Sequence, residues 1–566
     1  MNNKEYGACI PQMRVFIMGV MLVLNISPTV TFAQDNHNFE VAKNMDIFTA
    51  MYKNLDLMYV DTIEPSQVMT AGITAMLRSL DPYTEYYPEE KTKDLKMMLT
   101  GKYAGIGSVV RYHRRLKRVV IDEPYYGMPA ADAGLRKGDI IISIDDSIMT
   151  DKDVSYVSSH LRGDPGTSFM LEIEDPLTGE HRKMKITRKS IKLPAIPYYG
   201  MDDDNIAYIN LGDFTEGSAK EMRRAYVELK KAGAKGLILD LRNNGGGSLQ
   251  EAIDILSLWI PRGMTLVETR GKLTKVNRTY ITRMEPVDTL MPIAVLVNGE
   301  TASAAEITSG SIQDLDRGVV VGTRTYGKGL VQVPLELPYN TNMKVTTSKY
   351  YIPSGRCIQA IKYNHDGGGG YTERIPDSLT TVFHTVGGRE VRDGGGIAPD
   401  IIAQSDTIPN IALYLDRVDT MEVMFDFIVE YIATHDSIAP ASEFKLTDGE
   451  YEEFKDRVIA SGFTYDNFSV KKYDELVKAA KQEGYYDDAK ELFDSLRIKL
   501  NHDIARDLDR NREVIQEMIE HDIITAYHYE GGGLEASLKF DTQYAKAVSI
   551  LKDREQYDKI LMPDFE

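Results

Sequence analysis

The sequence is poor in cysteine and lacks an excess of basic side chains. Two cysteines in 566 residues are too few for a disulfide framework. Cys9 lies in a segment predicted below to be removed, so Cys357 has no expected intramolecular partner. The 66 Lys and Arg against 85 Asp and Glu give a net charge of −19, which argues against nucleic-acid binding because such proteins present a basic face. A hydrophobic fraction of 43% excludes wholesale disorder.

Long apolar runs are also scarce. Beyond residue 33 no segment has about 20 uninterrupted apolar residues, so no membrane-spanning helix is expected there. The first 33 residues differ, because Lys4 and Arg14 accompany an apolar stretch at 15–30 and small residues end it at Ala33. This pattern predicts a signal peptide over residues 1–33 and a periplasmic protein. The alternative is a chain that stays membrane-anchored through residues 15–30.

The length predicts about three or four domains. Apolar spacing and turn residues divide the chain into five regions. They are a signal peptide (1–33), an N-terminal helical region (34–97), a module of short strands (98–190), a region of alternating strands and helices (191–405) and a C-terminal helical region (406–566). In the alternating region we expect strands at 206–211, 236–241, 293–297 and 318–322, and helices at 218–231, 249–259 and 302–313. Outside it, Pro65 suits the start of a helix, a further helix is expected at 151–161, and glycine runs at 367–370 and 394–396 predict loops. The near-continuous apolar strands predict a sheet covered on both faces.

Two segments of this region place polar residues where buried strands end. Residues 240–247 read Asp-Leu-Arg-Asn-Asn-Gly-Gly-Gly, a glycine-rich turn that exposes backbone N–H groups. On this segment alone, an ordinary strand-to-helix turn is the simpler interpretation. Ser303 falls in the first turn of the next predicted helix, where unpaired N–H groups favour negative charge. Thr301 is the better-placed cap, which leaves Ser303 without an obvious structural task.

A third segment, Gly322 to Gly329, contains most of a P-loop motif. Lys328 is followed by Gly329 instead of Ser or Thr, and an alternating strand pattern follows where a P-loop would open a helix, so nucleotide binding is not expected. A lysine in a desolvated pocket has a lowered pKa and can accept a proton from a serine. No histidine lies between Ser303 and Lys328, and no metal-ligand spacing occurs in the chain. If Ser303 is a nucleophile, a lysine is its most plausible base, and no cofactor is expected.

Together, residues 242–247, 301–306 and 326–332 resemble the carboxyl-terminal processing (tail-specific) serine protease family, including its spacing from Ser303 to Lys328 and on to Gln332. The resemblance implies that Ser303 is the nucleophile, Lys328 the general base and Gln332 the residue that orients Lys328. It further implies an oxyanion hole formed by the backbone N–H groups of Gly246 and Ala304. The side chains of Asp314 and Glu306 would have supporting roles. Gly245 stands where the family commonly has proline, which loosens the turn.

The segment at 98–190 is similar to a PDZ domain. Residues 103–107 and 129–147 carry two of its signatures. The resemblance implies that backbone N–H groups of one loop capture a terminal carboxylate, and that Arg162 couples tail binding to the catalytic site. The residues of this carboxylate-binding loop are Tyr103, Gly105, Ile106 and Gly107.

By this resemblance the fold is α/β and multidomain. It has a ββα-spiral protease core, as in crotonases and the Clp-type peptidase subunit, with an inserted PDZ domain and helical N- and C-terminal regions. The implied function is an exported serine endopeptidase with a Ser/Lys dyad, which recognises apolar C-terminal tails of protein substrates through its PDZ domain and cleaves them. Partners other than substrates, an adaptor lipoprotein and a second copy in a homodimer, stay open.

Two other classes of function are open at this stage. One is a PDZ-bearing scaffold with an inactive core, and the other is an enzyme that acts on acyl thioesters, by fold analogy alone. The C-terminal helical region allows a dimerisation arm, a docking surface or packing against the core.

Overall fold

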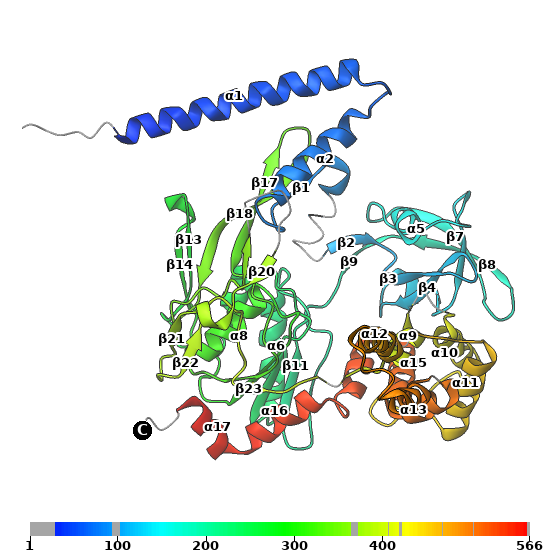
Figure 1. Cartoon of the computed structure of the whole chain (residues 1–566). Helices are drawn as coiled ribbons and strands as arrows, with labels where there is room; N and C mark the ends of the chain where they lie inside the picture. The colour runs from blue at the N-terminus through cyan, green and yellow to red at the C-terminus, as the bar shows by residue number, and fades with distance from the viewer. Residues whose placement is uncertain are drawn as a thin grey trace, which may run out of the picture. The chain divides into compact units, whose positions relative to one another are not determined.

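The computed structural model describes residues 29–92, 95, 102–363, 372–405, 407–417, 421–466, 468–501 and 503–562. The chain divides into two compact units, Met1–Ile73 and Thr74–Glu566. The helix α1 (Thr29–Met58) of the first unit is one long helix (Figure 1). The helix α2 (Pro65–Arg78) begins in the first unit, at the proline predicted to start it, and ends in the second. Residues 1–28 of the predicted signal peptide lie outside the described residues. In the part of the chain that is described, no helix is both long and apolar enough to cross a membrane.

The α/β core is built on a sheet with strand order β10-β11-β12-β15-β16-β23. β10 is antiparallel to β11, and the other neighbours are parallel. Every residue of β12, β15 and β16 is buried, which confirms that both faces of the sheet are covered. The strands are Tyr199–Met201 (β10), Ile206–Asn210 (β11), Gly236–Asp240 (β12), Ile293–Val297 (β15), Val319–Gly322 (β16) and Ile401–Ile402 (β23).

Side chains alternate along these strands and so feed two hydrophobic clusters. On one face, Leu239 and Val295 pack with helices α6, α7 and α8, which are Ser218–Lys231, Leu249–Leu256 and Ala304–Asp314. On the other face, Ile238 and Leu296 pack with α16 (Thr542–Lys552) and α17 (Arg554–Leu561). Figure 1 shows these two helices in red against the green strands. Among the roles open to the C-terminal region, packing against the core is therefore the one that α16 and α17 fulfil.

A second sheet has the order β1-β18-β13-β14, with β17 also paired to β18. β17 is the strand predicted after Lys328, and its presence agrees with the rejection of a P-loop. β1 comes from the N-terminal region and pairs with the start of β18, at residues 342–344. The strands are Glu85–Tyr87 (β1), Thr265–Gly271 (β13), Arg278–Ile281 (β14), Leu330–Leu337 (β17) and Thr341–Tyr351 (β18).

The PDZ-like segment forms a sheet of order β3-β4-β5-β7-β8, with β6 on β5 and a separate β2–β9 pair. Its helix α5 (Val154–Leu161) begins three residues later than predicted from position 151, because the Asp153 side chain caps it by accepting the Tyr156 N–H. A further helix, α4, covers Pro129–Asp132. The strands are Lys102–Gly105 (β2), Ser108–His113 (β3), Arg118–Pro124 (β4), Ile140–Ile144 (β5), Ser147–Ile148 (β6), Ser168–Glu174 (β7), His181–Thr187 (β8) and Lys189–Lys192 (β9).

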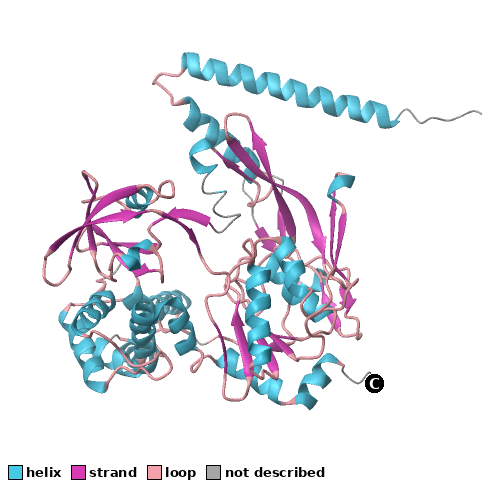
Figure 2. Cartoon of the chain, turned by 180° about the vertical axis from the view of Figure 1, so that it is seen from behind, coloured by secondary structure: helices cyan, strands magenta, loops and turns pink. Residues whose placement is uncertain are grey.

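Residues of the segments 411–463 and 508–536 form a hydrophobic core in the C-terminal helical region, and the two helices between these segments contribute none of its buried residues. In Figure 2 the helices of this region form a cluster in cyan, joined by pink loops. From α10, Phe425 and Val429 pack against Val120 and Ile140 of the PDZ-like segment. The helices are Asn410–Asp416 (α9), Val423–Thr434 (α10), Asp448–Ala460 (α11), Phe468–Glu483 (α12), Lys490–Leu500 (α13), Ile504–Arg510 (α14) and Arg512–Ser537 (α15).

Short elements in the remaining loops complete the second unit. Residues 364–371, which include the predicted glycine-rich loop at 367–370, lie outside the described residues, whereas residues 394–396 form a loop as expected. The short strands here are Ile361–Tyr363 (β19), Thr372–Arg374 (β20), Val382–His384 (β21) and Glu390–Arg392 (β22).

Candidate active site

Ser303 occupies the N-cap position of α8, directly before Ala304. Its backbone has φ 57° and ψ −116°, a conformation that non-glycine residues rarely adopt. The prediction that Thr301 caps this helix is wrong. The Thr301 hydroxyl donates to the carbonyl oxygen of Leu241 (2.8 Å) and accepts the N–H of Asn298 (2.9 Å), so it ties two loops together instead. The cap position falls to Ser303, which is held in a strained turn at a helix N-terminus.

The glycine-rich turn lies against this serine. A Cβ on Gly246 would be 2.7 Å from the Ser303 Cβ and 2.8 Å from the Ala304 nitrogen, so only glycine allows the approach. The Gly246 N–H donates to the Asn244 Oδ1 (2.8 Å), whereas the Ala304 N–H donates to no described residue. Ala304 therefore has the free donor that an oxyanion hole requires, while Gly246 has its donor engaged in this structure. Both assignments stay predictions.

Asn244 is a residue that the sequence did not single out. It is fully buried, and its side-chain amide donates to the carbonyl oxygen of Leu211 (2.6 Å). Its backbone carbonyl oxygen accepts the Ala302 N–H (2.9 Å). These bonds fix the turn to the strand end on one side and to the segment of the nucleophile on the other. The only sequence signal was its place in the turn.

Lys328 lies in the loop between β16 and β17. Its side-chain amine makes no hydrogen bond or ion pair with any described residue, and it sits 4.6 Å from the centre of the Tyr83 ring. Burial lowers the pKa of Lys328, and the nearby positive charge of Lys344 lowers it further. An amine in this setting favours the neutral form, which is the form that accepts a proton.

Glu306 joins the nucleophile segment to the lysine loop. One carboxylate oxygen accepts the N–H groups of Ser303 and Lys328, both at 2.9 Å. The other accepts the Thr325 hydroxyl (2.6 Å) and the Gly327 N–H (2.7 Å). Burial raises the pKa of this carboxyl, and these four bonds oppose the shift. The predicted supporting side chain thus fixes the backbones of Ser303 and Lys328 relative to each other.

Tyr350 is a second tie that the sequence did not assign. Its ring is buried, and its hydroxyl lies within hydrogen-bonding reach of the carbonyl oxygens of Ser303 (3.2 Å) and Lys328. Burial raises the pKa of this hydroxyl well above its ordinary value, so it stays protonated and can donate. Nothing in the sequence pointed to this bridge.

Gln332 and Asp314 have other partners in this structure. Gln332 lies on β17, and its amide donates to the Thr346 hydroxyl (3.2 Å), which is directly opposite in β18. Its predicted role in orienting Lys328 stays a prediction. Asp314 is fully buried, and it accepts from the Arg356 guanidinium (2.8 Å) and the Ser354 N–H (3.0 Å). Its support is given to the turn after β18.

The carboxylate-binding loop of the PDZ-like segment runs from β2 to β3. Within the described structure, the N–H groups of Ile106 and Gly107 donate to no other residue, as capture of a carboxylate requires. β3 is at the edge of its sheet, so an extended peptide can pair with it. The Arg162 guanidinium lies 5.6 Å from the centre of the Tyr103 ring, which places the predicted coupling residue beside this loop.

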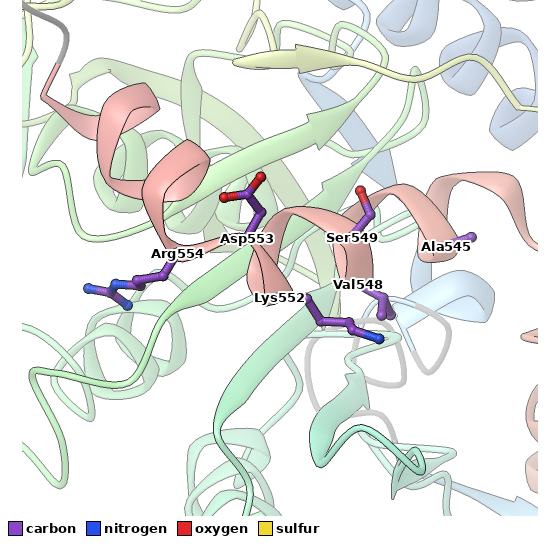
Figure 3. A pocket seen from close by; sticks show the side chains of 6 residues that line it. All are labelled: Ala545, Val548, Ser549, Lys552, Asp553 and Arg554. Atoms are coloured by element: carbon purple, nitrogen blue, oxygen red, sulfur yellow. The ribbon is translucent and has the colours of Figure 1, made fainter.

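A second serine and lysine line an open hollow of about 580 Å³ on α16 and α17 (Figure 3). Ser549 and Lys552 point away from each other there, and the Lys552 amine forms an ion pair with Asp204 at 2.6 Å. Because Asp204 holds this amine away from Ser549, the lysine is not positioned to take a proton from that serine. This hollow therefore has the residue types of a Ser/Lys site without the geometry.

Comparisons with known proteins define the class. The family models that match are Peptidase family S41 over residues 205–366, a PDZ domain over 120–175, and the C-terminal helical domain of probable PDZ-proteases over 414–551. The chain is therefore a PDZ-containing serine peptidase with an S41 core and a C-terminal helical domain, which confirms the predicted class of fold.

Relatives with described functions identify the family. The chain is 32% identical over 355 residues to a carboxy-terminal-processing protease of Bartonella bacilliformis, covering 62% of this chain and 81% of that one. It is 35% identical over 335 residues to a carboxyl-terminal-processing protease of a Picosynechococcus species, covering 59% and 78%. A solved photosystem II D1 C-terminal processing protease is 24% identical, covers 63% of this chain and 92% of that chain, and has a TM-score of 0.35. The protein belongs to the S41 family of C-terminal processing proteases, as its motifs predicted.

Proposed function

We propose that this protein is an exported endopeptidase in which Ser303 attacks the substrate and Lys328 is its general base. The observation that carries the proposal is that one buried carboxylate, Glu306, joins the backbone of a serine in a strained helix-N-terminal turn to the backbone of a lysine whose amine has no ion-pair partner among the described residues. The lowered pKa of Lys328 supports its role as a base. Glu306 and Tyr350 bind the backbones of both residues and limit their relative movement.

In the proposed reaction, Lys328 takes the proton of the Ser303 hydroxyl as its oxygen attacks the scissile carbonyl carbon. The negative charge that develops on the carbonyl oxygen is stabilised by the Ala304 N–H at the start of α8. Loss of such a donor typically costs about 10²- to 10³-fold in kcat. The protonated Lys328 then gives its proton to the leaving amine, and water releases the acyl group from Ser303.

Substrates would be proteins with apolar C-terminal tails. The tail would pair with the edge strand β3, and its carboxylate would accept from the N–H groups of Ile106 and Gly107. Export through residues 1–33, with retention through residues 15–30 as its alternative, forms part of the proposal on the sequence pattern alone. An adaptor lipoprotein and a second copy in a homodimer are further partners in this proposal, on the family resemblance alone.

The test uses one substrate protein with an apolar tail, supplied with a free or an amidated C-terminus and followed by intact mass. We expect the wild-type protein to cleave it, Ser303→Ala to leave it intact, and amidation to slow cleavage. Cleavage by Ser303→Ala would refute the assignment of the nucleophile. Tail binding without turnover, even with membrane components added, would instead support a scaffold.

A further inference from the structure

The segment Asp81–Tyr87, here called the N-terminal strap, reaches the lysine loop from a distant part of the sequence. The Asp81 carboxylate shapes it by accepting the N–H groups of Tyr83 (2.8 Å) and Thr84 (2.7 Å) and the Thr84 hydroxyl (2.9 Å). This turn lets the strap enter β1, which pairs antiparallel with the start of β18. Asp81 and Thr84 are 8% and 3% exposed, so this turn is buried.

Tyr83 is the strap residue that touches the catalytic lysine. Its ring centre lies 4.6 Å from the Lys328 amine, within the range of a cation–π interaction. No hydrogen bond or ion pair to a described residue holds this amine, so the ring face is the contact that limits where the end of the side chain can go. A flexible lysine stem has several rotatable bonds, and a ring packed against its end reduces the positions open to it.

Thr84 reaches Gln332 through one intermediate. Its hydroxyl accepts the Thr346 N–H (3.2 Å) and lies 3.3 Å from the Thr346 hydroxyl. The Thr346 hydroxyl in turn accepts from the Gln332 amide at 3.2 Å. The strap thus contacts Lys328 directly and Gln332 through Thr346.

We infer that the N-terminal strap completes the catalytic site, with Tyr83 as the positioning residue of the Lys328 amine and Thr84 as the positioning residue of Gln332. The inference rests on the proposed function, because it assigns roles toward the general base. It predicts that changes in the strap lower kcat and leave KM nearly unchanged, since the strap touches the base and its neighbour instead of the PDZ loop that takes the tail.

The pH profile separates positioning from simple support of the fold. The ring face favours the ammonium form of Lys328, so removal of the ring should move the rising limb of kcat to lower pH while the plateau falls. The other titratable and charged groups that face this amine are Lys344 of β18, Glu85 of β1, Glu306 of α8 and Asp81 of the strap. None of them is altered by a substitution at position 83.

The experiment measures kcat and KM of the full chain on one tailed substrate across pH, for wild type, Tyr83→Leu, Tyr83→Phe, Thr84→Val and Thr84→Ser. Cleavage by wild type and none by Ser303→Ala establishes the proposed function first, so that its failure is distinct from failure of the inference. Thr92→Ala is the matched control, because the Thr92 hydroxyl donates to the Asn340 carbonyl oxygen (2.8 Å) and touches no site residue.

We expect Tyr83→Leu and Thr84→Val to lose about tenfold or more in plateau kcat with KM within about twofold, since misplacement of a catalytic group by about 1 Å can cost 10²-fold. Tyr83→Phe keeps the ring, Thr84→Ser keeps the hydroxyl, and both should retain most of the activity, as should Thr92→Ala. Unchanged kcat in Tyr83→Leu, or equal losses in Tyr83→Leu and Tyr83→Phe, would overturn the role of the ring. If Tyr83→Leu does not fold, the comparison of Thr84→Val with Thr84→Ser decides the inference, and equal activity of these two overturns it.

Discussion

Substitution of Glu306 by glutamine tests how the site is held together. The carboxylate accepts four hydrogen bonds, two at each oxygen, and all four partners act as donors toward it. A glutamine has one acceptor oxygen, and its NH2 group would face two donors. Two charge-assisted bonds are lost, each worth about 1.5–3 kcal/mol, while relief of the desolvation that raises the pKa of this carboxyl offsets part of the loss.

The expected outcome for Glu306→Gln is a fall of roughly 3 kcal/mol in the free energy of unfolding, and a fall in kcat of at least about tenfold because the backbones of Ser303 and Lys328 are no longer tied. Urea unfolding and steady-state cleavage of a tailed substrate measure the two quantities. The matched control is Glu251→Gln in α7, whose carboxylate accepts the N–H groups of Gly217 (2.9 Å) and Ala219 (2.8 Å) at the start of α6.

The control should lose stability and keep kcat. If Glu306→Gln lost less than about 1 kcal/mol and retained wild-type kcat, the reasoning that this carboxylate connects nucleophile and base would be refuted. If both variants lost kcat equally, the effect would be a general loss of stability and the connection would again fail.

Further predictions concern the turn, the base and the PDZ contact. Gly246→Ala should abolish turnover, because a Cβ at this position, with φ 103°, would lie 2.7 Å from the Cβ of Ser303. A Cβ at Gly245 would meet nothing within 4 Å, so Gly245→Ala should keep turnover and gain about 0.4–1 kcal/mol in the free energy of unfolding. Equal turnover in the two glycine variants would contradict this geometry. Lys328→Met should be inactive yet melt at a higher temperature at neutral pH, since burial of the amine lowers its pKa and makes its charge costly; a lower melting temperature in calorimetry would count against it. Lys344→Met removes a positive charge that lowers the pKa of Lys328, so the rising limb of kcat should move to higher pH. The profile is recorded from about pH 6 to about pH 9, and an unmoved limb would show that Lys344 does not change the pKa of Lys328. Burial opposes protonation of His113, but hydrogen bonds to two carboxylates at the start of α10 raise its pKa to about 9. Protonated His113 therefore stabilises the contact between β3 and α10 fully below its ordinary pKa of about 6.5, and this stabilisation is lost as the pH rises through about 9. Hydrogen exchange in β3, corrected for the intrinsic rate, should accelerate over that range of pH, and constant protection would refute this.

Several features of the fold and the site could be predicted from the sequence. The strands β11, β12, β15 and β16 and the helices α6, α7 and α8 lie within a few residues of their predicted bounds, because apolar periodicity is a local property of the chain. The strands β13 and β14, which lie between them in sequence, were not predicted. The pair Ser303 and Lys328 could be proposed because glycine-rich segments and an absence of nearby histidine are visible in a linear sequence. A sheet covered on both faces followed from the continuous burial that strands such as β12 and β15 require.

The tertiary structure decided what holds the site in place. Glu306 accepts from the N–H of Lys328, Tyr350 contacts two carbonyl oxygens, and Tyr83 reaches the lysine from the N-terminal region. Such contacts depend on how loops close and on which strands pair, and local periodicity carries no information about either. The same holds for Thr301, whose hydroxyl could serve as a helix cap by sequence but is used in the folded chain to join two loops. The sequence by itself determined which residue types carry the chemistry, whereas the pairing of distant segments decided their neighbours, because a hydrogen bond needs positions within about 3 Å that only the folded chain provides.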